Sequence, residues 1–279
     1  MLMTLSTRNI FFRGGIIIAA LSLILVAAGG YFAYPAFPEA AASAVIRPGG
    51  ITEKLISSLA EPSSYVPLWT MLGAVVYSFI GIILIYHFFE KTQSSEILFI
   101  GLFVISLTFE FARIIIPMKN VLPLPAFFSI AAPRVLFFGR IFGLFSLFAS
   151  GVYAAGMDAQ KQRSFLLMLI LAALVIAINV PMDIFVWDST FLVWSGYRFM
   201  FSVIEAGILA ITIASFLISA FTRGSRSYVF IGIGVLLAFA GRNILINSDT
   251  WITVLPGMAI LSVGTWCICS RLHFVYLWL

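Results

Sequence analysis

The sequence predicts an all-α integral membrane protein, a polytopic helical bundle of eight transmembrane helices with both termini in the cytoplasm. Of the 279 residues, 62% are hydrophobic and only 10% are charged, whereas a soluble domain is about 25% charged. A mean hydropathy of +1.12 leaves no room for a soluble domain. The apolar runs are continuous and about 20 residues long, enough to cross a 30 Å hydrocarbon core as helices. A β-barrel would instead show alternating segments of roughly 10 residues.

The first apolar run covers residues 14–34 and follows Arg8 and Arg13. Positive charge before the run predicts a cytoplasmic N-terminus. A secretory signal peptide has a similar pattern, and its cleavage site would fall in the alanine-rich stretch 40–44. That stretch lies far downstream and the run is long, which favours an uncleaved signal anchor in residues 1–35. Cleavage would leave seven spans and place the new N-terminus outside.

Residues 36–64 are expected to form an extracytoplasmic loop. They contain prolines, a glycine pair and several charges, with one short amphipathic helix predicted near 51–59. Residues 65–279 are expected to form a seven-helix transmembrane bundle. A segment with three prolines, 121–133, is either an irregular outer connection or a short re-entrant piece. The seven spans are expected at 65–88, 97–118, 134–155, 165–187, 199–221, 228–246 and 251–270.

The distribution of lysine and arginine sets the orientation of these spans. The connections 160–163 and 222–226 are short and basic, so the positive-inside rule places them in the cytoplasm. Both termini then lie inside, and the bilayer is interpreted as the plasma membrane, the inner membrane of a bacterium. Four tryptophans near the predicted outer ends fit an interfacial aromatic belt: Trp69, Trp187, Trp194 and Trp251.

Charged side chains inside the spans are the candidate functional residues. A charge at bilayer depth costs at least a few kcal/mol and therefore usually faces a partner, a cavity or a pathway. Counting helical rise from the inner ends places four of them about 21–24 Å up and Arg113 about one turn above Glu110, in one layer in the outer half of the membrane. Asp183, in the span expected at 165–187, should lie slightly higher, and it is included in the layer as a candidate. The five are Glu110, Arg113, Arg140, Glu205 and Arg242.

The signs of these charges do not balance, since three arginines face two glutamates. Either Asp183 reaches into the layer, water hydrates it, or an anion occupies it. Along the span expected at 199–221 and the residue before it, polar residues recur on one helix face, and this face includes Arg198, Ser202 and Glu205. Three interpretations remain open: an ion-pair network that fixes helix register, a ligand pocket open to the outside, and an ion pathway. The last is disfavoured because the cytoplasmic halves carry almost no ionisable groups.

Motifs for catalysis, metal binding or cofactor binding are not found. His87 and His273 lack the spacing of a metal pair. Cys267 and Cys269 would point about 200° apart on a helix, which suits neither a disulfide nor a zinc site. The net charge of +5 comes largely from residues at the ends of apolar runs, so it indicates topology and no nucleic-acid partner. We therefore expect no enzyme activity, no cofactor and no metal.

The leading hypothesis is a non-enzymatic, sensor-like or receptor-like membrane protein. Its charged pocket in the outer half of the bundle would bind a small, anionic ligand, a lipid headgroup or a partner membrane protein. One alternative is a small permease or a membrane subunit of a transporter. A second alternative is a membrane scaffold in which the charges are only buried ion pairs. The last seven spans resemble a seven-helix bacterial membrane sensor module in architecture alone, which does not fix function.

Overall fold

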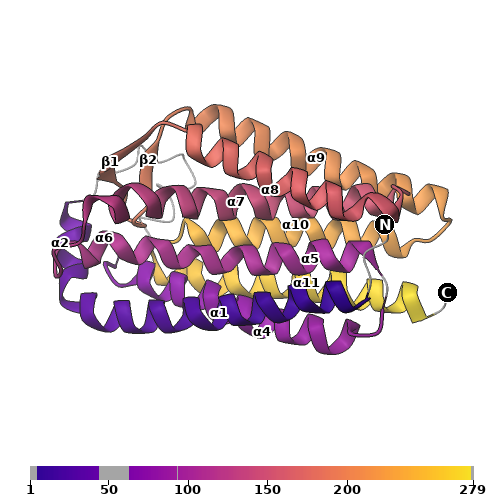
Figure 1. Ribbon diagram of the computed structural model, residues 1–279, viewed down its shortest axis with the longest axis horizontal. Helices are drawn as coiled ribbons and strands as arrows, with labels where there is room; N and C mark the ends of the chain where they lie inside the picture. Colours follow the sequence, from indigo (N-terminus) through magenta and orange to yellow (C-terminus); the bar gives the residue numbers. More distant parts are fainter. Residues whose placement is uncertain (1–4, 44–62, 93, 278–279) are drawn as a thin grey trace.

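The computed structural model describes residues 5–43, 63–92 and 94–277, and it shows a helical bundle (Figure 1). Eight helical segments of these residues are long and apolar enough to cross a membrane. The short helix predicted at 51–59 lies outside the described residues. In chain order the long helices are α1 (Leu5–Ala33), α4 (Val66–Phe89), α5 (Ser95–Ser106) with its continuation, α7 (Ala126–Ala154), α8 (Gln162–Asn179), α9 (Arg198–Thr222), α10 (Ser227–Ile246) and α11 (Trp251–Leu277).

The two ends of the bundle are distinct. Both chain termini lie at one end, here called the terminal end (Figure 1). The opposite end, here called the hairpin end, carries α2 (Phe37–Ala42), α6 (Ile115–Met118) and the two strands. The first helix reaches it through a short 3₁₀ turn, η1 (Tyr34–Ala36), and α2 then packs in a cluster with Phe191.

The central helix of the bundle changes geometry half-way along. It was expected as a single span over 97–118, but α5 ends at Ser106 and is followed by η2 (Leu107–Ile114), a 3₁₀ helix of eight residues, and then α6. Runs of 3₁₀ helix longer than three or four residues are uncommon. Residues three apart eclipse one another in a 3₁₀ helix, so Glu110 and Arg113 are aligned along the same edge of η2.

The predicted connection 121–133 is mostly helical. Helix α7 begins at Ala126 and contains Pro133, so the irregular connection is confined to the residues between Met118 and Ala126. Neither a thirteen-residue outer loop nor a re-entrant piece is therefore present. Pro133 cannot donate a backbone hydrogen bond inside the helix, and its position near the start of a long helix made the boundary hard to predict.

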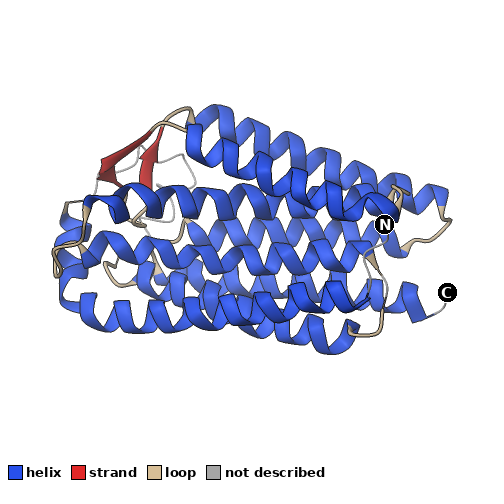
Figure 2. Cartoon of the chain, in the orientation of Figure 1, coloured by secondary structure: helices blue, strands red, loops and turns tan. Residues whose placement is uncertain are grey.

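The prediction of a span over residues 165–187 was wrong beyond Asn179. Helix α8 ends there, Val180 is extended as expected for a residue before proline, and residues Met182–Trp187 form strand β1. Strand β1 pairs antiparallel with β2 (Val193–Ser195), and the two strands are drawn in red in Figure 2. Their register places Asp183 opposite Trp194. The continuous apolar sequence concealed this change from helix to strand.

Helices α10 and α11 pack closely through small residues. A Cβ atom added to Gly241 or Gly264 would collide with the backbone of the facing helix, at Leu261 and Ala238 respectively. Close approach through small residues is a common way for helices to pack in a membrane. Helix α11 also runs to Leu277, beyond the expected end at 270, so His273 belongs to the helix and packs edge-on against Phe89 at 5.7 Å.

A polar network around Glu96, here called the clasp, links helices at the terminal end. The buried Glu96 of α5 accepts a hydrogen bond from Ser94 at 2.7 Å and another from Tyr276 of α11. Arg223, beyond α9, lies 3.9 Å from the same carboxylate. Arg8 of α1 donates to the carbonyl oxygens of Phe89 and Glu90 at 2.7 and 2.8 Å, which fastens α1 to the end of α4.

Candidate functional site

A carboxylate shared by two arginines forms the centre of the charged layer. Arg140 of α7 grips Glu110 with two hydrogen bonds, from Nε to Oε1 at 3.0 Å and from Nη2 to Oε2 at 3.1 Å. Arg113 adds a third, from Nη1 to Oε2 at 3.3 Å. The Glu110 residue is only 2% exposed. A buried charge is tolerated when its hydrogen bonds are completed in this way, so these three predicted residues form one closed network.

The same network reaches the hairpin through Arg113. Its Nε donates to the carbonyl oxygen of Thr190 at 3.0 Å, and its Nη2 donates to the same oxygen. Thr190 lies in the turn between β1 and β2, and this turn is built around the buried carboxylate of Asp188. Asp188 Oδ1 accepts from Thr190 N at 2.9 Å, Thr190 Oγ1 at 2.6 Å and Leu192 N at 3.1 Å. The hairpin is thereby docked onto the charged layer.

Sequence reasoning missed Asp188, although a signal for it was present. An aspartate two residues before a threonine is typical of a side chain that caps its own turn. The sequence predicts a span up to residue 187 and an aromatic belt at Trp187 and Trp194, which leaves Asp188 between them without a predicted role.

Arg242 of α10 sits beside this network without a carboxylate of its own. Its Nη2 donates to the carbonyl oxygen of Arg140 at 3.1 Å. Its Nη1 is buried and has no hydrogen-bond partner among the described residues. Glu205 and Glu110 attract Arg242 electrostatically, but neither carboxylate lies within 4.0 Å of it among the ion pairs of the described chain. Gly143 on α7 has no side chain, and Ser106 Oγ and Arg242 Nη1 lie close to the position that its Cβ atom would occupy.

Glu205 lies outside the closed network and lines a pocket. It is half-buried on α9, and it makes no hydrogen bond or ion pair with the part of the chain that the structure describes. The pocket has a volume of about 360 Å³ and lies between α7, α9, the hairpin and the end of α10. One wall is apolar, with Leu136, Phe137 and Phe201 among its residues. The polar side chains that line it are Arg140, Ser195, Arg198, Ser202, Glu205 and Asn247.

Arg198 supplies the second arginine of this pocket. It begins α9, its guanidinium lies 4.0 Å from the ring centroid of Trp194, and its Nη2 is 3.9 Å from Asp188 Oδ2. The preceding residue, Tyr197, has a left-handed backbone with φ of 58°. Bulky residues rarely adopt that conformation, and here it turns the chain from β2 into α9 so that Arg198 lies over the pocket.

Asp183 is not brought to the charged layer. It is exposed on β1, and its Oδ1 accepts a hydrogen bond from the backbone N–H of Phe185 at 3.1 Å. With Asp188 and Arg198 included instead, the hairpin end gathers Arg113, Arg140, Arg198 and Arg242 against Glu110, Asp188 and Glu205. Asp249 lies at the same end, where its Oδ2 accepts a hydrogen bond from Ser189 Oγ of the hairpin turn at 3.1 Å, so these described side chains carry four positive and four negative charges.

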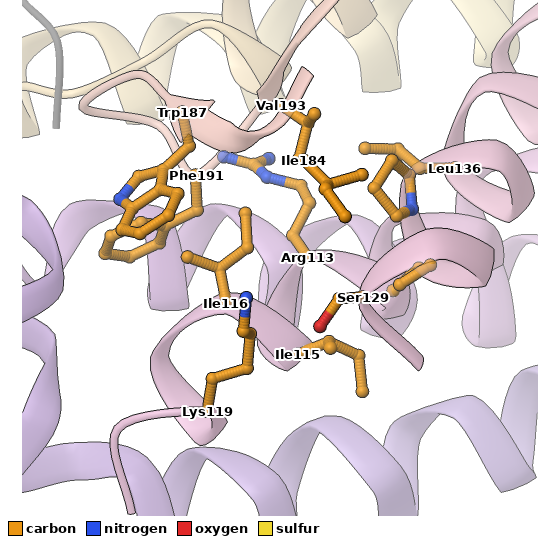
Figure 3. A pocket seen from close by; sticks show the side chains of 13 residues that line it. Arg113, Ile115, Ile116, Lys119, Ser129, Leu136, Ile184, Trp187, Phe191 and Val193 are labelled. Atoms are coloured by element: carbon orange, nitrogen blue, oxygen red, sulfur yellow. The ribbon is translucent and has the colours of Figure 1, made fainter. Parts of the chain in front are cut away.

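A second cavity lies beside Arg113 but is far smaller. Figure 3 shows Arg113 extending toward the hairpin among Ile184, Trp187 and Phe191, with Ser129 on another side of the cavity. Its volume of about 20 Å³ has room for about one water molecule. The pocket of about 360 Å³ is the candidate ligand site, because it is the larger of these two and is lined by charged side chains.

The described residues contain no group of three or more His, Cys, Asp or Glu side chains that could hold a metal ion. No protein-family model matches the chain, and the comparison with curated proteins finds no significant match.

Proposed function

We propose that this chain is a multi-pass protein of the plasma membrane, a bacterial inner membrane, with its hairpin end outside and both termini in the cytoplasm. Eight apolar helices of sufficient length support insertion in a membrane. The orientation rests on the positive-inside rule, since the basic connections beside Lys161, Arg223 and Arg226 lie at the terminal end. The close packing of α1 against the bundle supports an uncleaved first segment.

The proposed activity is the binding of a small anionic ligand in the pocket at the hairpin end, as a sensor or receptor does, without chemical conversion. The observation that carries this proposal is a pocket of about 360 Å³ with polar and apolar walls, whose charged lining residues are two arginines, Arg140 and Arg198, and one glutamate, Glu205. Arg140 uses Nε and Nη2 for Glu110, so its Nη1 is left for a ligand. Arg198 offers a partly exposed guanidinium at the rim, and arginine forks suit carboxylates and phosphates.

A purely structural role is favoured for part of the layer. Glu110, Arg113 and the Thr190 carbonyl satisfy one another and tie three elements together: η2, α7 and the hairpin. This closed network requires no ligand. The scaffold interpretation therefore describes these residues, while Arg198 and the remaining donor of Arg140 carry the ligand-binding proposal.

Equilibrium binding of radiolabelled phosphate and acetate to the purified protein tests the proposal. We expect Arg198→Ala to weaken binding about tenfold, because a hydrogen bond to a charged group contributes about 1.5–3 kcal/mol. Arg134→Ala is the matched control, since Arg134 is an exposed arginine of α7 and does not line the pocket. Equal binding by folded Arg198→Ala and by the wild type, or no binding of either anion, would overturn the proposal.

A further inference from the structure

We infer that the ligand of this pocket is a small zwitterion, whose acidic group meets Arg198 and Arg140 and whose ammonium group meets Glu205. The inference rests on the proposed function and adds a second charge to the ligand. It starts from Glu205, which the anion-binding proposal leaves without a role. A free carboxylate in an anion site would repel the ligand, so its presence there needs a reason.

The described surroundings of Glu205 contain no cationic group within ion-pair distance of its carboxylate. A half-buried carboxylate loses hydration, and that loss is offset when a positive group and hydrogen-bond donors approach it. Among the described residues no lysine or arginine nitrogen lies within ion-pair distance of Glu205. Arg242 attracts it only from farther away, and Arg242 Nη2 is engaged with the Arg140 carbonyl. A ligand ammonium in the pocket would provide the missing partner.

The spacing on α9 separates the two charges of the pocket. Arg198, Ser202 and Glu205 lie at i, i+4 and i+7 on one face of the helix, and all three line the pocket. Arg198 and Glu205 are therefore about 10 Å apart along the helix axis, measured at their backbones. Ser202, between them, can donate or accept a hydrogen bond. This order suits a ligand with an acidic group and an ammonium group joined by a short linker.

The pocket that holds the two charges also has apolar lining. Leu136 and Phe137 of α7 and Phe201 of α9 line the same pocket. Methylene groups of a linker would bury apolar surface there, at about 25 cal/mol per Å². An inorganic ion would leave this wall without a contact. Phosphoethanolamine has the required chemistry, and the same group also occurs as the headgroup of a phospholipid.

Titration calorimetry with the full chain in detergent tests the inference, with phosphoethanolamine, phosphate and ethanolamine as separate probes. We expect phosphoethanolamine to bind at least about tenfold more tightly than either half. Glu205→Gln should remove this advantage and leave phosphate binding unchanged or stronger. Asp183→Asn is the matched control, because Asp183 is a nearby exposed carboxylate that does not line the pocket; this variant should bind like the wild type.

A second arm separates a free zwitterion from a lipid headgroup. The protein is placed in nanodiscs of phosphatidylethanolamine or of phosphatidylglycerol, and phosphoethanolamine is titrated into both. If phosphoethanolamine binds more weakly in phosphatidylethanolamine nanodiscs than in phosphatidylglycerol nanodiscs, the lipid competes for the pocket and its headgroup is the ligand. Equal affinity for phosphoethanolamine in both lipids supports a free zwitterion. If Glu205→Gln binds phosphoethanolamine as tightly as the wild type while Arg198→Ala does not, the inference is wrong and the anion site stands. Failure of every probe to bind would overturn both.

Discussion

Glu110 and Glu205 are carboxylates at the same end of the bundle with opposite surroundings. Glu110 is buried and accepts three hydrogen bonds from two arginines. Glu205 is half-buried beside a pocket, without a hydrogen bond or ion pair from the described part of the chain. Burial makes the first a structural group, and access to the pocket makes the second available to a ligand.

Replacement of each glutamate by glutamine should separate these roles. Glu110→Gln leaves two arginine side chains without their shared anion, and breaking a buried pair in this way costs about 3–5 kcal/mol. Glu205→Gln removes no contact within the described protein and should change the free energy of unfolding by less than about 1 kcal/mol. Chemical unfolding in detergent measures both. Equal destabilisation by the two substitutions would contradict the division of the layer.

At the scale of elements, the fit between α5–η2 and α7 depends on two glycines. A Cβ atom on Gly139 would collide with Phe109, and one on Gly143 would collide with Ser106. These glycines bring α7 close enough for Arg140 to reach Glu110 across the interface. The close approach in turn fixes the position of the hairpin, because Arg113 holds the turn at Thr190.

Gly143→Ala should therefore destabilise the protein by about 1–3 kcal/mol, the usual cost of overpacking. Gly207→Ala is the control, since Gly207 lies on α9 and a Cβ atom added to it would have no neighbouring atom within 4 Å. That substitution should stabilise the helix slightly, by up to about 1 kcal/mol, because alanine is the better helix former. Thermal unfolding of both variants tests this. A Gly143→Ala variant as stable as Gly207→Ala would show that the interface has room that its geometry does not indicate.

Some of this arrangement could be predicted from the sequence. Helix-length apolar runs fix the long helices, and counting residues along them places Glu110, Arg140 and Glu205 at a common level. The pairing of Glu110 with two arginines could not be predicted, because it depends on how the helices rotate about their axes. The 3₁₀ segment of η2 was equally hidden, since its apolar residues suit either helix type.

The hairpin could not be predicted because its first strand continues the apolar run of α8 without a break. Only Pro181 marks the change, and prolines also occur inside membrane helices. The sequence already placed Arg198 on one helix face with Glu205, but the approach of Arg198 to Asp188 became visible only when this turn was placed beside α9.

At the scale of the whole molecule, the charged layer consists of a closed network and an open pocket. The network holds the central helix, α7 and the hairpin together, and the pocket beside it is proposed to open to the external solution. The clasp at Glu96 closes the opposite end. A ligand would therefore reach the pocket from the hairpin end, and no polar path to the terminal end is required.

The accessibility of two introduced cysteines tests this division most directly. In a background with Cys267 and Cys269 replaced by alanine, Ser202→Cys and Ser106→Cys are exposed to a charged, membrane-impermeant thiol reagent in right-side-out vesicles. Ser202 is exposed and lines the pocket, whereas Ser106 is buried and donates to the Phe103 carbonyl at 2.7 Å. We predict rapid labelling at 202 and none at 106. A cysteine at 202 that stays unlabelled, or that reacts only in inverted vesicles, would contradict an outward-facing pocket.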